Sequence, residues 1–234
     1  GFAPNSVLSS GSWYKISVPE SGIYKITHSD LENLGIGVSS INPKTIRIFG
    51  GQGGLLPEMV GEPTIDDLTE LSVYVSGEQD GSFDDGDYVL FYGYGPNVWK
   101  EDEESGGFSY LKHLYATVNY YYINVGNAEG KRVTTLDENI QQTDFVTTSF
   151  DERIHHENNL TNLINSGKIW FGEVFELTTK QTFPFTLPDI VQGSPLKVKT
   201  HVASRCSEIT KFTISANGRS KNISMPYVSG ANSV

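Results

Sequence analysis

The sequence is short of cysteine and of long apolar runs. Cys206 is the one cysteine among 234 residues, so no disulfide can form within the chain. No stretch approaches the roughly 18 consecutive apolar residues that a membrane helix needs, which excludes such a helix from this sequence. The first residues, Gly1–Pro4, lack the charged and apolar regions of a signal peptide, and we expect the chain to be an excised fragment of an exported protein.

Positive charge is also scarce. The chain has 17 Lys and Arg against 28 Asp and Glu, a net charge of −11. Much of the acid lies between Glu58 and Glu104, whereas residues 196–221 carry six basic residues and one acid, Glu208. A chain this acidic, with no long basic face, is a poor candidate for binding a phosphate backbone, so we expect no nucleic-acid partner. The acidic stretch is interpreted as solvated loops and turns.

Aromatic residues and glycine are plentiful by comparison. The chain has 12 Tyr, 12 Phe and 3 Trp, too much apolar bulk for a disordered segment. Its 24 Gly and 10 Pro follow no G-x-y period and therefore indicate many turns. These features predict a turn-rich globular protein.

Short alternating segments bounded by turn residues predict a mainly β fold, or β-dominated α+β. We predict strands at Trp13–Val18, Ile23–Thr27, Thr45–Phe49, Leu71–Val75, Tyr88–Tyr92, Thr117–Val125, Trp170–Leu177, Leu196–Ala203 and Ile209–Ala216. Pro19–Gly22 is predicted to join the first two strands as a hairpin, and Asn217-Gly218 is a strong signal for another. Because Tyr120–Tyr122 is aromatic on both faces, we expect it to lie between two layers.

One or two short helices complete the prediction. Ser29-Asp30-Leu31-Glu32 resembles a capping box, and Gly35 would end that helix after about two turns. A second helix is predicted at Asn159–Asn165, where apolar residues recur at helical spacing before Gly167.

The chain is predicted to contain two β-rich modules. The stretch from Lys131 to Asp144 is polar and lacks periodicity. We therefore expect an N-terminal module over residues 1–137, a linker at 138–142, and a second, β-sandwich-like module over 143–234.

Four acidic residues, Asp80, Asp84, Asp85 and Asp87, are a weak candidate for a structural Ca²⁺ site. Clustered carboxylates among glycines can bind Ca²⁺ through oxygen ligands, although the spacing is not that of an EF-hand. We favour a turn before the strand at Tyr88–Tyr92, in which Asp side chains accept hydrogen bonds from turn amides. No other metal or cofactor is expected.

Three further motifs contain residue types that occur in catalytic or ligand-binding sites. His201 and Cys206 are five residues apart in a predicted strand region, which places them on opposite faces and disfavours a thiol-protease pair. His155-His156-Glu157 lacks a second ligand cluster at the spacing of a zinc site. Phe49–Gly54 is glycine-rich but lacks the Lys-Ser/Thr of a P-loop. We therefore expect no catalytic residues in this chain.

Exposed aromatic side chains suggest an alternative function. Trp99, Trp170 and Tyr120–Tyr122 could form a platform on which sugars stack, although most aromatics in a β protein belong to cores and sheet faces. The alternative hypothesis is therefore a surface adhesion or carbohydrate-binding module, which aromatics in a row on one sheet face would favour.

Several stretches, taken in order, resemble one protein family. They are Ser12–Ile16, Gly22–Ile26, Asn42–Gly50, Asp84–Tyr92 with Gly95-Pro96, His113–Tyr115, Asn119–Tyr122 and Asn165–Glu173. Together they are similar to the N-terminal region of the type IX secretion system sortases of Bacteroidetes, the PorU-like branch of the gingipain (C25) cysteine peptidases. The resemblance extends over roughly Trp13 to Ala216.

The resemblance implies an accessory role within a larger exported protein. In this family a downstream caspase-like domain holds the catalytic His and Cys, and neither motif occurs here, so no catalytic residue is carried over. The implied function is scaffolding, docking of substrate or partner, or regulation of that domain. The implied partners are the downstream catalytic domain of the same chain, secreted cargo proteins or other secretion-system components. The implied location is the periplasm, outer membrane or cell surface of a Gram-negative bacterium.

Overall fold

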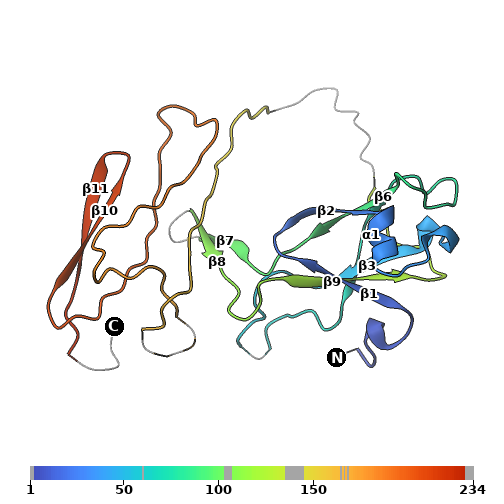
Figure 1. Ribbon diagram of the computed structural model, residues 1–234, viewed down its shortest axis with the longest axis horizontal. Helices are drawn as coiled ribbons and strands as arrows, with labels where there is room; N and C mark the ends of the chain where they lie inside the picture. The colour runs from blue at the N-terminus through green and yellow to red at the C-terminus, as the bar shows by residue number, and fades with distance from the viewer. Residues whose placement is uncertain are drawn as a thin grey trace. The chain divides into compact units, whose positions relative to one another are not determined.

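The protein is β-rich and divides into two compact units, which comprise residues 1–139 and 140–234 (Figure 1). This computed structural model describes residues 3–59, 61–102, 107–134, 145–163, 165, 167 and 169–229. Its strands form antiparallel sheets and it has a single α-helix among the described residues, which confirms the predicted β-dominated fold. The predicted linker at 138–142 lies outside the described residues, and the predicted module boundaries stay a prediction.

A four-stranded antiparallel sheet forms one layer of the first unit. Its strands follow the order β1 (Trp13–Val18), β9 (Asn119–Val125), β3 (Ile46–Gly50) and β4 (Thr69–Leu71). Since side chains alternate along a strand, β9 turns Tyr121 into the core and leaves Tyr120 exposed. The expectation that the Tyr120–Tyr122 run lies between two layers is therefore wrong for its outer face.

A three-stranded antiparallel sheet forms the opposite layer, in the order β2 (Gly22–Thr27), β6 (Tyr88–Gly93) and β5 (Tyr74–Val75). The two sheets share one buried apolar cluster. The rings of Phe91 and Tyr121 meet across it with centroids 5.5 Å apart. The first unit is thus a small β-sandwich.

The predicted hairpin between the first two strands is wrong. β1 pairs with β9, and β2 pairs with β6, so that Pro19–Ser21 carries the chain from one sheet to the other. Both strands bury an alternating apolar face in the same core. That pattern fits a hairpin of β1 with β2 as well as it fits pairing of each strand with a distant one. In the structure each strand pairs with a strand far along the chain, so that β1 and β2 belong to different sheets.

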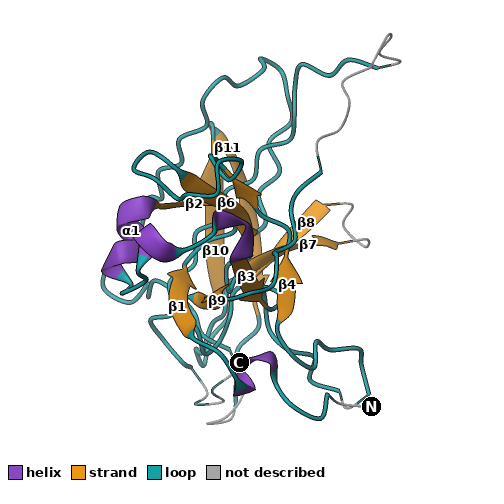
Figure 2. Cartoon of the chain, turned by 90° about the vertical axis from the view of Figure 1, so that its right-hand side faces the viewer, coloured by secondary structure: helices purple, strands orange, loops and turns teal. Residues whose placement is uncertain are grey.

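Helix α1 (His28–Asn33) follows β2 directly and lies beside it (Figure 2). Its N-cap is Thr27, whose hydroxyl accepts a hydrogen bond from the Asp30 backbone N–H while the Asp30 carboxylate accepts one from the Thr27 N–H. The predicted helix is confirmed, but its capping box lies two residues earlier than expected. Leu31 is fully buried, and Gly35 ends the turn with a φ of 84°.

Short 3₁₀ turns and one further hairpin complete the first unit. The turns are Val7–Ser9, Val38–Ser40 and Pro43–Thr45. Strands β7 (Val98–Asp102) and β8 (Gly107–Leu111) pair with each other, and the Trp99 ring packs edge-on against Tyr110 with centroids 5.1 Å apart. This hairpin was not predicted, because acidic residues interrupt its apolar alternation.

Among its described residues, the second unit contains one hairpin, made of β10 (Thr210–Ala216) and β11 (Arg219–Met225). Its predicted turn is confirmed, with Asn217 and Gly218 at φ values of 49° and 77°. The described residues of the predicted helix at 159–165 are not helical, and one of them, Thr161, forms an isolated bridge with Phe171.

Two other strand predictions in this unit are wrong. Leu196–Ala203 forms no ladder, and Trp170–Leu177 contributes only the bridge at Phe171. Their alternating sequences require a neighbouring strand, and no described part of the chain supplies one. The β-sandwich-like form of the second unit therefore stays a prediction. Within the described residues, no helix is long and apolar enough to cross a membrane.

Gly50 tests the sandwich core, because a Cβ atom at this position would overlap the Tyr121 ring. We expect Gly50→Ala to lower the free energy of unfolding by about 1–3 kcal/mol through overpacking. Gly51→Ala is the matched control, since nothing lies within 4 Å of a Cβ there. Urea denaturation would measure both. An equal stability of the two variants would contradict the packing of Tyr121 over Gly50.

Candidate functional site

The four aspartates of the weak Ca²⁺ candidate lie in a turn before β6. Asp80 accepts a hydrogen bond from the Ser82 N–H at 2.9 Å, and Asp87 accepts one from the Asp84 N–H at 2.9 Å. The described residues contain no group of three or more acidic, His or Cys side chains placed to hold a metal ion. Asp80 and Asp87 thus each accept a hydrogen bond from a turn amide, and a Ca²⁺ site at Asp80, Asp84, Asp85 and Asp87 stays a weak prediction.

Both histidine motifs lie in the second unit. His201 and Cys206 are both exposed, and no hydrogen bond joins them. His156 Nε2 lies 3.0 Å from Glu173 Oε1, and Asn158 donates to the same oxygen at 2.8 Å. These two contacts lower the pKa of the Glu173 carboxyl, and the contact with His156 has the larger effect. They tie residues 156–158 to the segment that follows Phe171.

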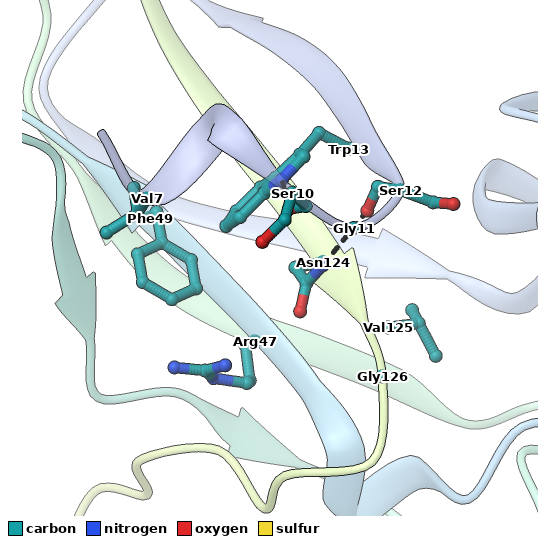
Figure 3. Close-up of a pocket in the computed structure, with 10 residues that line it drawn as sticks. All are labelled: Val7, Ser10, Gly11, Ser12, Trp13, Arg47, Phe49, Asn124, Val125 and Gly126. Carbon is teal, nitrogen blue, oxygen red and sulfur yellow. Dashed lines mark hydrogen bonds between the residues drawn. The ribbon is translucent and has the colours of Figure 1, made fainter. Parts of the chain in front are cut away.

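A groove of about 380 Å³ lies over the outer face of the four-stranded sheet (Figure 3). Trp13, Asn124 and Arg47 stand side by side on β1, β9 and β3, because the register pairs each with its neighbour. Phe49 packs edge-on against Trp13 with centroids 5.0 Å apart, and the Arg47 guanidinium lies 4.7 Å from the Phe49 ring centre. An arginine, an amide and two aromatic rings therefore line this groove.

The N-terminal segment forms one wall of the groove. Asp67 holds it by accepting hydrogen bonds from the Val7 N–H at 2.6 Å and from the Ser6 hydroxyl at 2.9 Å. These bonds lower the pKa of the Asp67 carboxyl, and the bond from Val7 has the largest effect. Asn124 in turn donates to the Ser12 carbonyl at 3.0 Å.

The positive charge of Arg47 is already paired. Its Nη2 lies 2.7 Å from Glu70 Oε2, and the other Glu70 oxygen accepts a hydrogen bond from the Lys131 N–H at 2.8 Å. The hydrogen bond with Glu70 raises the pKa of Arg47. Because Glu70 neutralises this charge, the groove is a weaker candidate for an anion than its composition suggests. The buried Nε of Arg47 has no hydrogen-bond partner among the described residues.

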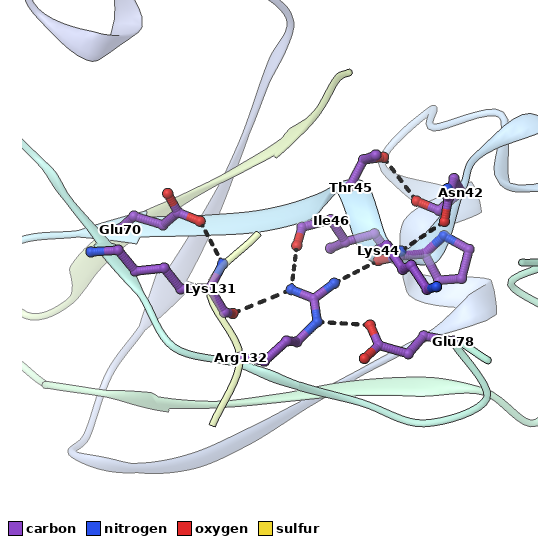
Figure 4. A network of polar contacts seen from close by, with 9 residues as sticks. Asn42, Lys44, Thr45, Ile46, Glu70, Glu78, Lys131 and Arg132 are labelled. Carbon is purple, nitrogen blue, oxygen red and sulfur yellow. Dashed lines mark hydrogen bonds and ion pairs between the residues drawn. The ribbon is translucent and has the colours of Figure 1, made fainter. Parts of the chain in front are cut away.

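A second polar network, centred on Arg132, lies at the start of β3 in the four-stranded sheet (Figure 4). Arg132 Nε donates to Glu78 at 2.7 Å, while its Nη atoms donate to the carbonyls of Pro43 and Ile46 at 2.9 and 3.2 Å. The segment after β9 is thereby fixed to the start of β3. These contacts give Arg132 a structural role.

Tyrosines gather on the outer face of the three-stranded sheet. On this face Ile23 pairs with Tyr92, and Leu90 pairs with Tyr74. The side chains of Ile23, Tyr74 and Tyr92 are 75%, 45% and 49% exposed. Tyr94 packs edge-on against Tyr92 with ring centroids 5.0 Å apart. The sequence suggested Trp99, Trp170 and Tyr120–Tyr122 for a platform instead, because the pairing that brings Tyr74 and Tyr92 onto one face joins distant parts of the chain.

Many large apolar side chains of the second unit are exposed. No hydrophobic residue among its described positions, 145–163, 165, 167 and 169–229, is buried. Its half-exposed or more exposed large side chains include Phe145, Val146, Phe150, Leu160, Ile169, Val174, Leu177, Phe185, Ile190, Val191, Leu196, Val198, Ile209 and Tyr227. Exposed apolar surface on this scale is typical of sites that contact other polypeptide or a ligand.

Fold and surfaces together define a class: a two-unit β protein with one packed sandwich and one unit whose described apolar side chains are half-buried or exposed. No family model matches the sequence, and no curated protein matches it. Among solved structures, the chain is similar to dimeric latent PorU from Porphyromonas gingivalis, with a TM-score of 0.70 and 25% sequence identity. The match covers 96% of this chain and 20% of that protein. The chain therefore has a PorU-like fold and spans about a fifth of the length of that neighbour.

Glu70 makes the sandwich sensitive to acid. Burial raises the pKa of its carboxyl, but hydrogen bonds from Arg47 and Lys131 outweigh burial and lower the pKa below 4.5. The carboxylate therefore contributes stability above about pH 4.5, and this contribution is lost as the pH falls through the lowered value.

We expect Glu70→Gln to flatten the acid limb of the stability curve, with a loss of about 1 kcal/mol at neutral pH. Urea denaturation between pH 3 and pH 7, values that bracket the carboxyl range, would measure this. The exposed Glu62→Gln is the matched control. An unchanged acid limb in Glu70→Gln would contradict the role given to this carboxylate.

Proposed function

We propose that this chain is a non-catalytic N-terminal accessory region of an exported, PorU-like C25 peptidase, and that it docks through its second unit. The observation that carries the proposal is the contrast between the units. The first buries a complete apolar cluster between its sheets, whereas no described hydrophobic residue of the second is buried. The PorU-like fold and the greater length of the solved neighbour support the same function.

Energetics favour docking over an independent second unit. Ordering a chain costs about 1–2 kcal/mol per residue in backbone entropy, and burial of apolar surface is the main compensation. The described side chains of the second unit provide little of it. Contact with further polypeptide would bury this surface and supply the missing stabilisation.

The proposed partners are the downstream catalytic domain of the same polypeptide, secreted cargo proteins and other secretion-system components. The downstream domain is favoured, because a tethered partner is present at high effective concentration. The proposed location is the periplasm, outer membrane or cell surface of a Gram-negative bacterium. The chain would act there as a scaffold, a docking surface or a regulator of the peptidase.

The gene that encodes the chain provides the direct test of this proposal. We expect its reading frame to continue past Val234 into a domain of several hundred residues, the size of a large catalytic domain, with separate His and Cys motifs. Such a domain is the expected result. A stop codon at or just after this position would overturn the proposal and favour a stand-alone surface module.

A second candidate function, adhesion or carbohydrate binding, is favoured by the tyrosine face of the three-stranded sheet. Tyr74, Tyr92 and Tyr94 are all more than two-fifths exposed there, and aromatic faces suit stacking on sugars. If this function holds, Tyr92→Ala should weaken binding to a polysaccharide by about tenfold in affinity electrophoresis. Tyr115→Ala, at an exposed tyrosine outside the sheets, should leave it unchanged. Equal retardation of both variants would exclude this face.

A further inference from the structure

Leu196–Ala203 has the sequence of a strand but no partner strand among the described residues. Leu196, Val198 and Val202 alternate with Lys197, Lys199 and His201, which is the two-residue period of a half-buried strand. The structure nevertheless places this segment in no ladder. Leu196 and Val198 are 53% and 56% exposed, so the face that the pattern marks as apolar is open.

The hairpin β10–β11 shows the same incompleteness. One of its faces is polar, with Thr213 hydrogen-bonded to Asn222 and Ser215 to Ser220 across the strands at 2.7 Å. The other face carries Phe212 opposite Ile223 and is only partly buried. A two-stranded hairpin is marginal in water, and a stable sheet needs further strands or a packing partner.

The positive charge of residues 196–221 indicates which side chains a partner strand would carry. Residues 196–221 contain six basic residues and one acid. A second copy of the segment would set Lys197 close to a like charge, which destabilises cross-strand pairs. A strand with acidic residues on the matching face would form pairs of opposite charge instead. Apolar side chains on its other face would meet Leu196 and Val198.

We propose that Leu196–Ala203 is a β-augmentation site that binds an extended strand in which apolar and acidic residues alternate. The inference rests on the proposed function, since this strand belongs to the further polypeptide on which the second unit docks. Main-chain hydrogen bonds supply affinity in such pairings, and the alternating side chains supply selectivity. The added strand forms a ladder with this segment and sets its own apolar side chains beside Leu196 and Val198.

A labelled peptide of about eight residues, the length of the segment, tests this proposal. Val and Glu alternate in the peptide, and Val and Lys alternate in its control. We expect this chain to bind the acidic peptide at least about tenfold more tightly than the basic one in fluorescence anisotropy, and more weakly at high salt. Amide chemical-shift changes should include Leu196–Ala203. Equal affinity for the two peptides, or shifts confined to the first unit, would overturn the assignment.

Two variants locate the site. Lys197→Glu should weaken binding of the acidic peptide by about threefold to tenfold, because it replaces an attractive charge with a repulsive one. Lys180→Glu, at another exposed lysine of the second unit, should leave the affinity unchanged. Equal weakening by both variants would indicate general charge attraction and overturn the strand site. Sedimentation showing a dimer that Val198→Asp abolishes would assign the segment to a second copy and also overturn it.

The peptide and gene experiments separate the two proposals. A reading frame that continues into a peptidase domain, together with no peptide binding, would overturn the strand site and uphold the accessory function. Peptide binding by a chain whose gene stops near Val234 would overturn the accessory function and support an acceptor strand for a separate polypeptide.

Discussion

The first unit depends on Tyr121, which fills the space between its two sheets. The ring lies directly over Gly50 of the neighbouring strand and meets Phe91 of the opposite sheet. Its hydroxyl accepts a hydrogen bond from the Tyr94 N–H at 2.6 Å, so that a buried polar atom is satisfied where β6 ends. Burial raises the pKa of this phenol. One side chain thus joins the sheets and fixes the chain that leaves them.

The second unit lacks any such buried side chain among its described residues, and this difference underlies the proposed function. Its sequence is as rich in alternating apolar residues as that of the first unit, yet its described apolar side chains lie at the surface. A sheet cannot form from strands whose partners are missing, because each strand needs both a ladder and a covered face. We therefore regard the open surface as one that further polypeptide covers.

The sequence predicted single elements better than their pairing. Trp13–Val18, Tyr88–Tyr92 and the turn at Asn217-Gly218 were located correctly, because period-two alternation and turn chemistry are local. The partner of β1 was not predictable, since β9 lies about a hundred residues away and the buried alternation fits either sheet. The tyrosine face was missed because it joins residues of β2, β5 and β6, which only the strand pairing brings together. Leu196–Ala203 was predicted as a strand, but it forms no ladder among the described residues.

Hydrogen exchange at the backbone amides, compared between this chain and a longer polypeptide that contains it, tests the central claim most directly. Slow exchange in β3, β6 and β9 should be common to both, since the sandwich is complete in this chain. Amides of Leu196–Ala203 should exchange rapidly in this chain and slowly in the longer polypeptide. Slow exchange of that segment in this chain alone would contradict the account, because it would show that the second unit is already complete.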